Sequence, residues 1–561
     1  MLAYIGVIQY NTERYVIIDQ NKNNKRTDSI MSDIFEKKPS AASGQKPRQD
    51  GASRRKTRED KERKEKRKVR TIAVCVLTVV ALLFAGALFI NSKLIRRTLP
   101  AVSVGGVDFS AVEFDYYFVT ALNEYRQMWE SYLGEEAAAD YLPSNESPLS
   151  SQIFNYETGE TWEDYVSQMA LSNMTEMVKI YNDAKAAGYE LNEETLQAIE
   201  DEIESLRSTA PLYGYNSISE FFLKVYGISV DEKTFRKIVE FSHYTSAYNN
   251  HVRESFTYSE GELAEYYAEN ADSLDTFKFR IFLHDAEYVD DIFDTDEEYE
   301  EADRASLAAA SEQAAIIMAG IESEDDFIES ARVYNEDAYA EDDSTLASTA
   351  GSNLAGEDYE EWLKDARRAY GDKTTIDSAD GTYLLFFIGR ENNDYQTASM
   401  RQILIYQDVI DPSMYEDGED DPDYIEAVLE AETTATERAN TVFDLFKEGG
   451  ATESKFLELI DDGHSDDSTE GGFYEKIRKD QFGIEDLDTW LFDPDRKVGE
   501  YILINSEAYG YHLIYFSGLG VRACDVIAED GLIQRDYKAW QDSLEQLEAV
   551  KHWAFTLTLK H

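Results

Sequence analysis

One run of apolar residues limits what this chain can fold into more than any other feature. The 19 residues from Ile72 to Ile90 include no charged residue and no proline. A helix rises about 1.5 Å per residue, so this run spans roughly 28 Å, the thickness of the hydrocarbon core of a bilayer. We therefore predict a transmembrane helix over residues 71–91, which attaches the protein to the membrane.

The charges on either side of this run predict its orientation. Thirteen Lys and Arg residues lie between Lys46 and Arg70, whereas three follow the run directly. Basic residues remain on the cytoplasmic side, so residues 1–70 are expected to be a cytoplasmic, largely disordered arm, and the bulk of the chain extracytoplasmic. A cleaved signal peptide is the alternative. It is disfavoured because the basic stretch is too long for one and no clear cleavage site follows.

The net charge excludes one class of partner. Residues 1–100 hold 22 basic and 10 acidic residues, hence +12, and the remainder holds 32 and 102, hence −70. The strong negative charge of the residues after 100 repels the phosphate backbone of nucleic acids, and we expect no nucleic-acid binding. Aromatic residues make up 12% of the chain, which is too many for a disordered acidic protein, so folded domains are expected.

Residues 98–275 are predicted to form a mainly helical domain. Pairs with the spacing of a capping box stand directly before apolar runs, for example Thr161 with Asp164 and Ser229 with Glu232. Such pairs mark the first turn of a helix, because the Ser or Thr side chain accepts a hydrogen bond from a backbone N–H three residues later.

The beginning of this region has a second pattern. Residues 102–110 alternate and turn at Gly105 and Gly106, and residues 113–118 then read Glu-Phe-Asp-Tyr-Tyr-Phe, which predicts a short hairpin followed by a helix. This order resembles the N-terminal chaperone domain of the SurA/PrsA class of extracytoplasmic foldases. The resemblance implies a domain that binds unfolded or newly translocated proteins.

Residues 276–520 contain an internal repeat of about 110 residues. The same landmarks recur in the same order, namely Arg280, Phe327, Trp362 and Gly381 in the first copy and Arg401, Phe456, Trp490 and Gly510 in the second. Each copy begins and ends with a β-rich run and has helical patterns between, so each is predicted to be an α/β unit. The expected domains are residues 276–392 and 397–520, and the fold class of the chain is α+β.

The second copy resembles a parvulin-type peptidyl-prolyl cis-trans isomerase. Its first strand reads Arg-Gln-Ile-Leu from Arg401, a glycine pair stands at Gly471 and Gly472, and its last strand reads Gly-Tyr-His-Leu-Ile from Gly510. The resemblance implies isomerisation of X–Pro bonds without a metal or cofactor. It also implies a hydrogen-bonded network of two histidines and a Cys or Asp, in which His512 is the second histidine and Asp467 takes the Cys or Asp position. Phe482, Leu487 and Trp490 would line the proline pocket.

The sequence departs from the family at one important position. The family has a histidine where this chain has Gln402, and glutamine forms hydrogen bonds but cannot titrate. The first copy departs further, with Ile281 at the position of Gln402 and Tyr383 at that of His512. We therefore expect the first copy to be noncatalytic. For His512 and Asp467, a purely structural role is the alternative.

Acidic stretches follow the first strand of both copies, over residues 285–303 and 408–423. They would repel phosphorylated ligands, so ordinary unfolded segments with X–Pro bonds, including cationic ones, are the expected clients. Near the end of the chain, apolar residues recur at helical spacing; they are Trp540, Leu544, Leu547, Val550, Ala554 and Leu557. Residues 521–561 are therefore expected to form a C-terminal helix that packs on the chaperone domain.

Three hypotheses follow for the whole chain. The first is a membrane-anchored foldase whose second parvulin-like domain isomerises X–Pro bonds. The second is a catalytically inactive holdase of the same fold. The third is a cell-envelope scaffold held by the basic arm. The sequence leaves a homodimer open.

Overall fold

The structure is a computed structural model that describes residues 74, 76–80, 93–288, 295–415, 418–506 and 509–559. The chain divides into two units, Met1–Ser92 and Lys93–His561, and the second contains the folded elements described below. The described part combines helices with small antiparallel sheets, which confirms the predicted α+β class.

The predicted membrane segment falls mainly outside this description. Residues 1–70, the expected arm, are not among the described residues, and of the expected helix only Val74 and residues 76–80 are, all of them helical. Among the described residues, no helix has both the length and the apolar character needed to cross a membrane. The transmembrane helix stays a prediction.

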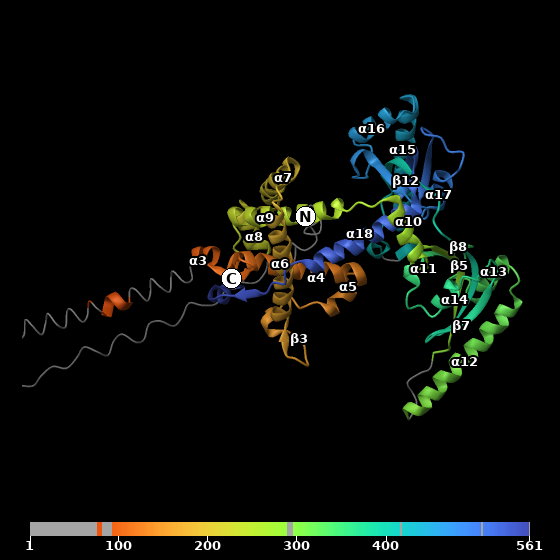
Figure 1. Cartoon of the computed structure of the whole chain (residues 1–561), viewed down its shortest axis with the longest axis horizontal. Coiled ribbons are helices and arrows are strands. Elements are labelled where there is room, and N and C mark those ends of the chain that lie inside the picture. Colours follow the sequence, from red (N-terminus) through yellow and green to blue (C-terminus); the bar gives the residue numbers. More distant parts are fainter. Residues whose placement is uncertain are drawn as a thin grey trace, which may run out of the picture. The chain divides into compact units, whose positions relative to one another are not determined.

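The region after residue 98 begins with a hairpin and continues with helices (Figure 1). Strands β1 (Pro100–Val104) and β2 (Val107–Ser110) pair antiparallel, and Ser110 then forms a capping box with Glu113 at the start of α4 (Ala111–Leu133). The main helices that follow are α6 (Trp162–Ala187), α7 (Glu193–Thr209), α8 (Ile218–Val225), α9 (Glu232–Ser255) and α10 (Glu260–Glu269).

The capping signals were correct for α6 and wrong for α9. Thr161 and Asp164 form the predicted box at α6. At α9 the N-cap is Asp231, whose carboxylate accepts from the backbone N–H of Thr234. Ser229 lies outside the helix, and its carbonyl oxygen accepts from the guanidinium of Arg97 at 2.8 Å.

Two four-stranded antiparallel sheets follow, and their strands have the same order. The first lobe has the order β6-β5-β8-β7, with β5 (Thr276–Asp285), β6 (Leu346–Ala350), β7 (Lys373–Asp377) and β8 (Gly381–Glu391). The second lobe has the order β10-β9-β12-β11, with β9 (Gln396–Tyr406), β10 (Phe473–Ile477), β11 (Tyr501–Ser506) and β12 (Gly510–Arg522). If the strands of each copy are numbered along the chain, their order across the sheet is second, first, fourth, third in both lobes.

Helices connect the strands of each lobe. The first lobe has α12 (Asp296–Gly320), α13 (Glu324–Tyr334) and α14 (Glu360–Lys364), and the second has α15 (Pro422–Glu448), α16 (Glu453–Asp461) and α17 (Glu485–Leu491). The last part of the acidic stretch expected after β5, residues 296–303, is the first part of helix α12.

Individual contacts repeat between the lobes as well. The arginine of the first strand pairs with the first residue of a helix, Arg280 with Glu324 at 2.9 Å and Arg401 with Glu453 at 2.7 Å. A second arginine lies over a tryptophan ring, Arg368 over Trp362 at 4.3 Å and Arg496 over Trp490 at 4.1 Å. The repeated landmarks thus have the same structural roles in both copies.

The C-terminal segment differs from its prediction. Helix α18 (Ala523–Ser543) packs against α10, where Gly531 lies too close to the Tyr266 ring for a larger residue. Among the described residues after Ser543 there is no α-helix: β13 (Ala549–Lys551) pairs with β1, and the short 3₁₀ helix η8 (Trp553–Leu557) follows. Pairing with the free edge of β1 outweighs the helical spacing of the apolar residues, so the predicted helix over this part was wrong.

Candidate site in the second lobe

The candidate residues meet on one face of the sheet of the second lobe. His512 on β12 lies opposite Leu404 on β9, and Gln402 stands two residues before Leu404, so His512 and Gln402 share a face. Both are buried, with exposed fractions of 4% and 5%. Asp467 comes from the loop after α16, which runs along β9: the Leu404 N–H donates to Ser465 Oγ at 3.2 Å.

The glycine pair lets this loop approach the sheet. Gly472 has a φ of +58°, and a Cβ there would lie 2.2 Å from the carbonyl oxygen of Gln402. Only glycine fits such an approach in the left-handed region. The predicted glycine pair therefore sets the distance between the loop that carries Asp467 and the strand that carries Gln402.

A chain of hydrogen bonds joins the three predicted residues. Gln402 Nε2 donates to Asp467 Oδ2 at 3.3 Å, and Gln402 Oε1 lies 3.0 Å from His512 Nδ1. Because the amide N–H faces the carboxylate, the amide oxygen faces the imidazole and can only accept. His512 Nδ1 must therefore carry a proton, which fixes the tautomer of a neutral ring.

Two further residues complete the chain and were not identified from the sequence. The Tyr474 hydroxyl donates to Asp467 Oδ2 at 2.7 Å, and the Thr469 hydroxyl lies 2.9 Å from that of Tyr474. Since the tyrosine proton points to Asp467, the threonine must donate. The only sequence signal was their position beside the glycine pair.

Asp467 is the acceptor on which both arms of the chain end. Burial alone would raise the pKa of Asp467, but hydrogen bonds from Tyr474, Thr469 and Gln402 together hold it below its usual value. Asp467 is thus charged at neutral pH, and its charge orients the donors around it.

His512 is held in its neutral form. Burial lowers the pKa of His512, although the nearby Asp467 charge acts in the opposite direction. With its proton on Nδ1, the neutral ring has a bare Nε2, which is buried and has no hydrogen-bond partner among the described residues. The imidazole is therefore a fixed, uncharged part of the site.

The predicted pocket residues lie on the same side of the sheet. Leu487 is buried in an apolar cluster with residues of β9 and β12, and Phe482 and Trp490 pack against that cluster, half-buried. The members of the cluster on β9 and β12 alternate with the opposite face, so they continue the face of Gln402 and His512. Helices α15 and α16 cover the other face.

Among its described residues, the first lobe has no equivalent of the hydrogen-bond chain. Tyr383 lies opposite Leu283 as His512 lies opposite Leu404, so the two positions correspond. At the position of Gln402 stands Ile281, which packs at the edge of an apolar cluster. An isoleucine cannot join a tyrosine to a carboxylate, so within the described part of the chain the polar network is found in the second lobe.

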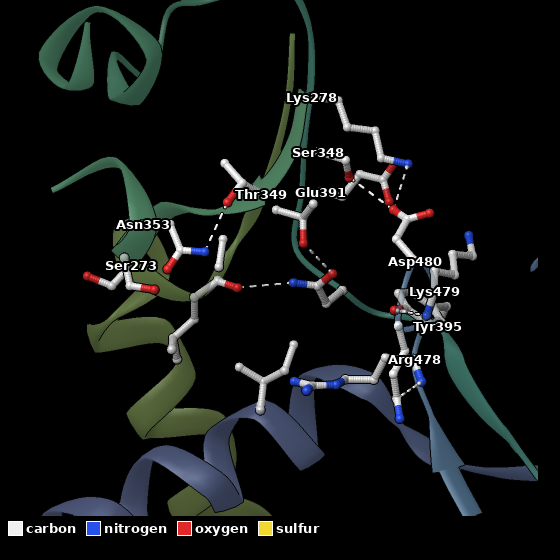
Figure 2. A pocket seen from close by; sticks show the side chains of 17 residues that line it. Ser273, Lys278, Ser348, Thr349, Asn353, Glu391, Tyr395, Arg478, Lys479 and Asp480 are labelled. Carbon is white, nitrogen blue, oxygen red and sulfur yellow. Dashed lines mark hydrogen bonds and ion pairs between the residues drawn. The ribbon is translucent and has the colours of Figure 1, made fainter. Parts of the chain in front are cut away.

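A cavity of about 520 Å³ adjoins both lobes. It is lined mainly by polar residues of β5, β6, the segment between the lobes and the loop over residues 478–481, and Figure 2 shows the hydrogen bonds and ion pairs among them. Asp480 Oδ2 accepts from Ser348 Oγ at 3.0 Å and lies 3.9 Å from Lys278 Nζ. The first lobe thus holds the loop that leads into α17, the helix of Leu487 and Trp490.

An unusual carboxyl lies behind this contact. The backbone N–H of Asp480 donates to Asp488 Oδ2 on α17, while Asp488 Oδ1 is buried and has no hydrogen-bond partner among the described residues. Burial raises the pKa of Asp488 to about 6, and the Asp480 carboxylate adds to the effect. The protonated form is therefore the one that the fold prefers.

This carboxyl leads to a test by pH. The pKa of Asp488 is higher in the folded protein than in the unfolded chain. Its protonation therefore stabilises the fold fully below about pH 4, and this stabilisation is lost as the pH rises through about 6. We expect Asp488→Asn to remove this loss and to stabilise the protein at pH 7.5 by about 1 kcal/mol, since partial exposure weakens the full effect. Urea unfolding of both proteins between pH 4.5 and 7.5 measures it.

The control for this test is Asp486→Asn, an exposed aspartate on the same helix. It changes the charge by the same amount and is expected to leave the slope of stability against pH unchanged. An Asp488→Asn protein that loses stability with rising pH as steeply as the wild type would contradict the assignment.

Among the described residues, no group of three or more His, Cys, Asp or Glu side chains is placed to hold a metal ion. A scan against models of protein families found no match for this chain, and a search among curated proteins found none either. The interpretation of the site therefore depends on its residues and geometry.

Proposed function

We propose that the second lobe catalyses cis-trans isomerisation of X–Pro bonds in unfolded proteins, and that the chain is a membrane-anchored, extracytoplasmic foldase. The observation that supports this most directly is the chain of hydrogen bonds from His512 through Gln402 to Asp467. It lies on the face of the sheet that also presents the apolar residues around Leu487.

The reaction needs no nucleophile, because no covalent bond breaks. The barrier of about 18–20 kcal/mol arises from amide resonance, which is lost when the bond twists. The planar amide is strongly dipolar and is stabilised by water, whereas the twisted amide is less so. A site that removes water from the X–Pro bond and holds the proline ring against apolar side chains therefore favours the twisted form.

In this proposal each residue has a defined part. The half-buried Phe482 and Trp490 contact the proline ring and the buried Leu487 supports them from below, while the buried His512 gives the site a neutral, rigid floor. Gln402 keeps the hydrogen-bond polarity of a neutral histidine, since its amide N–H takes the place of the ring N–H and its oxygen that of the bare nitrogen. Gln402 is thus a positioning residue, which acts through His512 and Asp467.

A second candidate is a holdase without isomerase activity. The observation that favours it is the first lobe, which keeps the strand order of the second but has Ile281 and Tyr383 in place of the polar network. A lobe of this kind can bind unfolded segments or act as a spacer between domains. If the second lobe does the same, the whole protein binds unfolded chains without altering their proline bonds.

The direct test is an isomerisation assay on the full-length chain with a proline-containing tetrapeptide. Uncatalysed cis-trans exchange takes tens to hundreds of seconds. We expect the chain to make this exchange much faster. A suppression assay with an aggregating test protein is run in parallel. Suppressed aggregation together with an uncatalysed isomerisation rate would reject the isomerase and support the holdase.

A further inference from the structure

An unusual aromatic surface lies in the helical region, away from the two lobes in the sequence. Six rings form it: Tyr125, Trp129 and Tyr132 on α4, Tyr141 after it, Phe154 on β3 (Ile153–Asn155), and Tyr165 on α6. Their ring centroids follow one another without a break, from Tyr132 through Trp129 and Tyr125 to Tyr165 and Phe154, at 6.5, 6.2, 5.8 and 3.7 Å. Figure 1 labels α4, β3 and α6, which carry five of the six rings.

One end of this surface is open to solvent. Tyr132 is 79% exposed and Tyr141 is 51% exposed, although Tyr141 is stacked on the Trp129 ring at 4.7 Å. Met128 on the same helix is 52% exposed. Large apolar side chains that gather and remain exposed mark an interaction site rather than a core.

The charged residues in the stretch that carries these rings are almost all acidic. Between residues 98 and 178 there is one basic residue, Arg126, against fourteen acidic ones, whereas the whole chain has 54 against 112. Arg126 is already used, because its guanidinium donates to Asn145 Oδ1 at 3.2 Å. Burial raises the pKa of Glu124, on α4, and no neighbouring cation offsets it. Cations from outside this stretch pair with Glu113, Asp115 and Glu176. The carboxylates on or next to the elements of the rings, Glu124, Glu130 and Asp140, form no ion pair with any described residue, so a cation that binds there meets unpaired negative charge.

The same chain shows what such rings bind when a cation is present. Arg496 lies over Trp490 at 4.1 Å and Arg368 over Trp362 at 4.3 Å, so guanidinium groups stack on half-buried indoles in both lobes. A cation over an aromatic face is attracted by the ring quadrupole, and carboxylates nearby add to that attraction.

We propose that the aromatic surface binds a cationic, unstructured segment of a client protein, with Lys or Arg side chains over Tyr132 and Tyr141. This inference rests on the proposed role in folding and names the class of client. Binding at the aromatic surface does not require proline in the client. The surface binds clients by their positive charge, and the second lobe acts on their X–Pro bonds.

The test uses a fluorescent, proline-free peptide of Gly and Ser with four Arg residues, and its binding to the full-length chain is followed by fluorescence anisotropy. We expect the double variant Tyr132→Ala/Tyr141→Ala to raise the Kd at least tenfold. Binding is also expected to weaken in high salt. A peptide with Glu in place of each Arg is expected not to bind.

The matched control is Tyr288→Ala, an 81% exposed tyrosine in the acidic stretch of the first lobe. We expect it to leave the Kd unchanged. Equal weakening by Tyr288→Ala and by the double variant, unchanged binding by the double variant, or equal binding of the Glu peptide would each overturn the proposal. Circular dichroism checks that the double variant is folded, which its exposed positions favour.

Two further measurements separate this inference from the proposed isomerase. His512→Ala is expected to bind the Arg peptide as tightly as the wild type, since the catalytic site takes no part. The double variant is expected to isomerise the short proline tetrapeptide at the wild-type rate. A chain without isomerase activity that still binds the Arg peptide through Tyr132 and Tyr141 would refute the isomerase and leave the binding surface in place.

Discussion

His512→Ala is expected to lower kcat/KM for X–Pro isomerisation at least tenfold, which corresponds to about 1.4 kcal/mol of transition-state stabilisation. The substitution removes the imidazole from the floor of the site and leaves Gln402 Oε1 buried without its donor. The measurement is the proline tetrapeptide assay on the full-length chain. Circular dichroism and a urea midpoint show whether the variant is still folded.

The variants of Gln402 separate a positioning role from a merely structural one. Gln402→Leu breaks the chain to Asp467 and is expected to lower the rate in the same way as His512→Ala. Gln402→His restores the same donor and acceptor pattern, so we expect it to keep the rate. The wild-type rate is expected to be flat between pH 6.5 and 8, because the pKa of His512 is lowered and glutamine does not titrate. Gln402→His adds a titrating group, so we expect the rate of this variant to change with pH over the same range.

His464→Ala is the control for the loss of a histidine from the same lobe, and we expect it to keep the wild-type rate. A His512→Ala protein that is folded and retains more than half of the wild-type rate would contradict the assigned role. A fully active Gln402→Leu protein would show that the hydrogen-bond chain does not position the site.

The sequence was enough to identify three members of the polar network. His512, Gln402 and Asp467 come from positions that the repeat and the family resemblance single out, and they are joined by hydrogen bonds. What the sequence could not give is the polarity of that chain. The direction of the Gln402 amide follows from the charge of Asp467, and that charge is kept by Tyr474 and Thr469, which reach the site only through the fold.

Helix packing shows the same limit. Apolar residues recur at helical spacing along α6 on two adjacent stripes. The fully buried residues are Val166, Ala170, Met174, Val178 and Ala184, whereas Met169 and Met177 are only half-buried. A helix repeat fixes the spacing of a stripe, but neighbouring helices decide which of two adjacent stripes is covered. The C-terminal segment is a stronger case, because the strand β13 exists only as a partner of β1, which lies more than 400 residues earlier in the sequence.

The glycine beside the site leads to the largest expected change in stability. In Gly472→Ala, the new Cβ would lie 2.2 Å from the Gln402 carbonyl oxygen, a backbone atom that cannot rotate away. The residue also has a φ of +58°, where alanine is strained by about 1–2 kcal/mol. We expect the second lobe to lose about 3–5 kcal/mol in total, since β9 and the loop must move apart.

Gly463→Ala is the control that separates the two contributions. Gly463 has a φ of +78°, but a Cβ there would meet nothing within 4 Å, so only the backbone strain applies. We expect a loss of about 1 kcal/mol for this variant. Hydrogen exchange of peptides from β9 and β12, measured by mass spectrometry, reports the opening of this lobe separately from the rest of the chain. Equal effects of the two variants would show that the loop can retreat from Gln402, and that Gly472 does not set the position of Asp467.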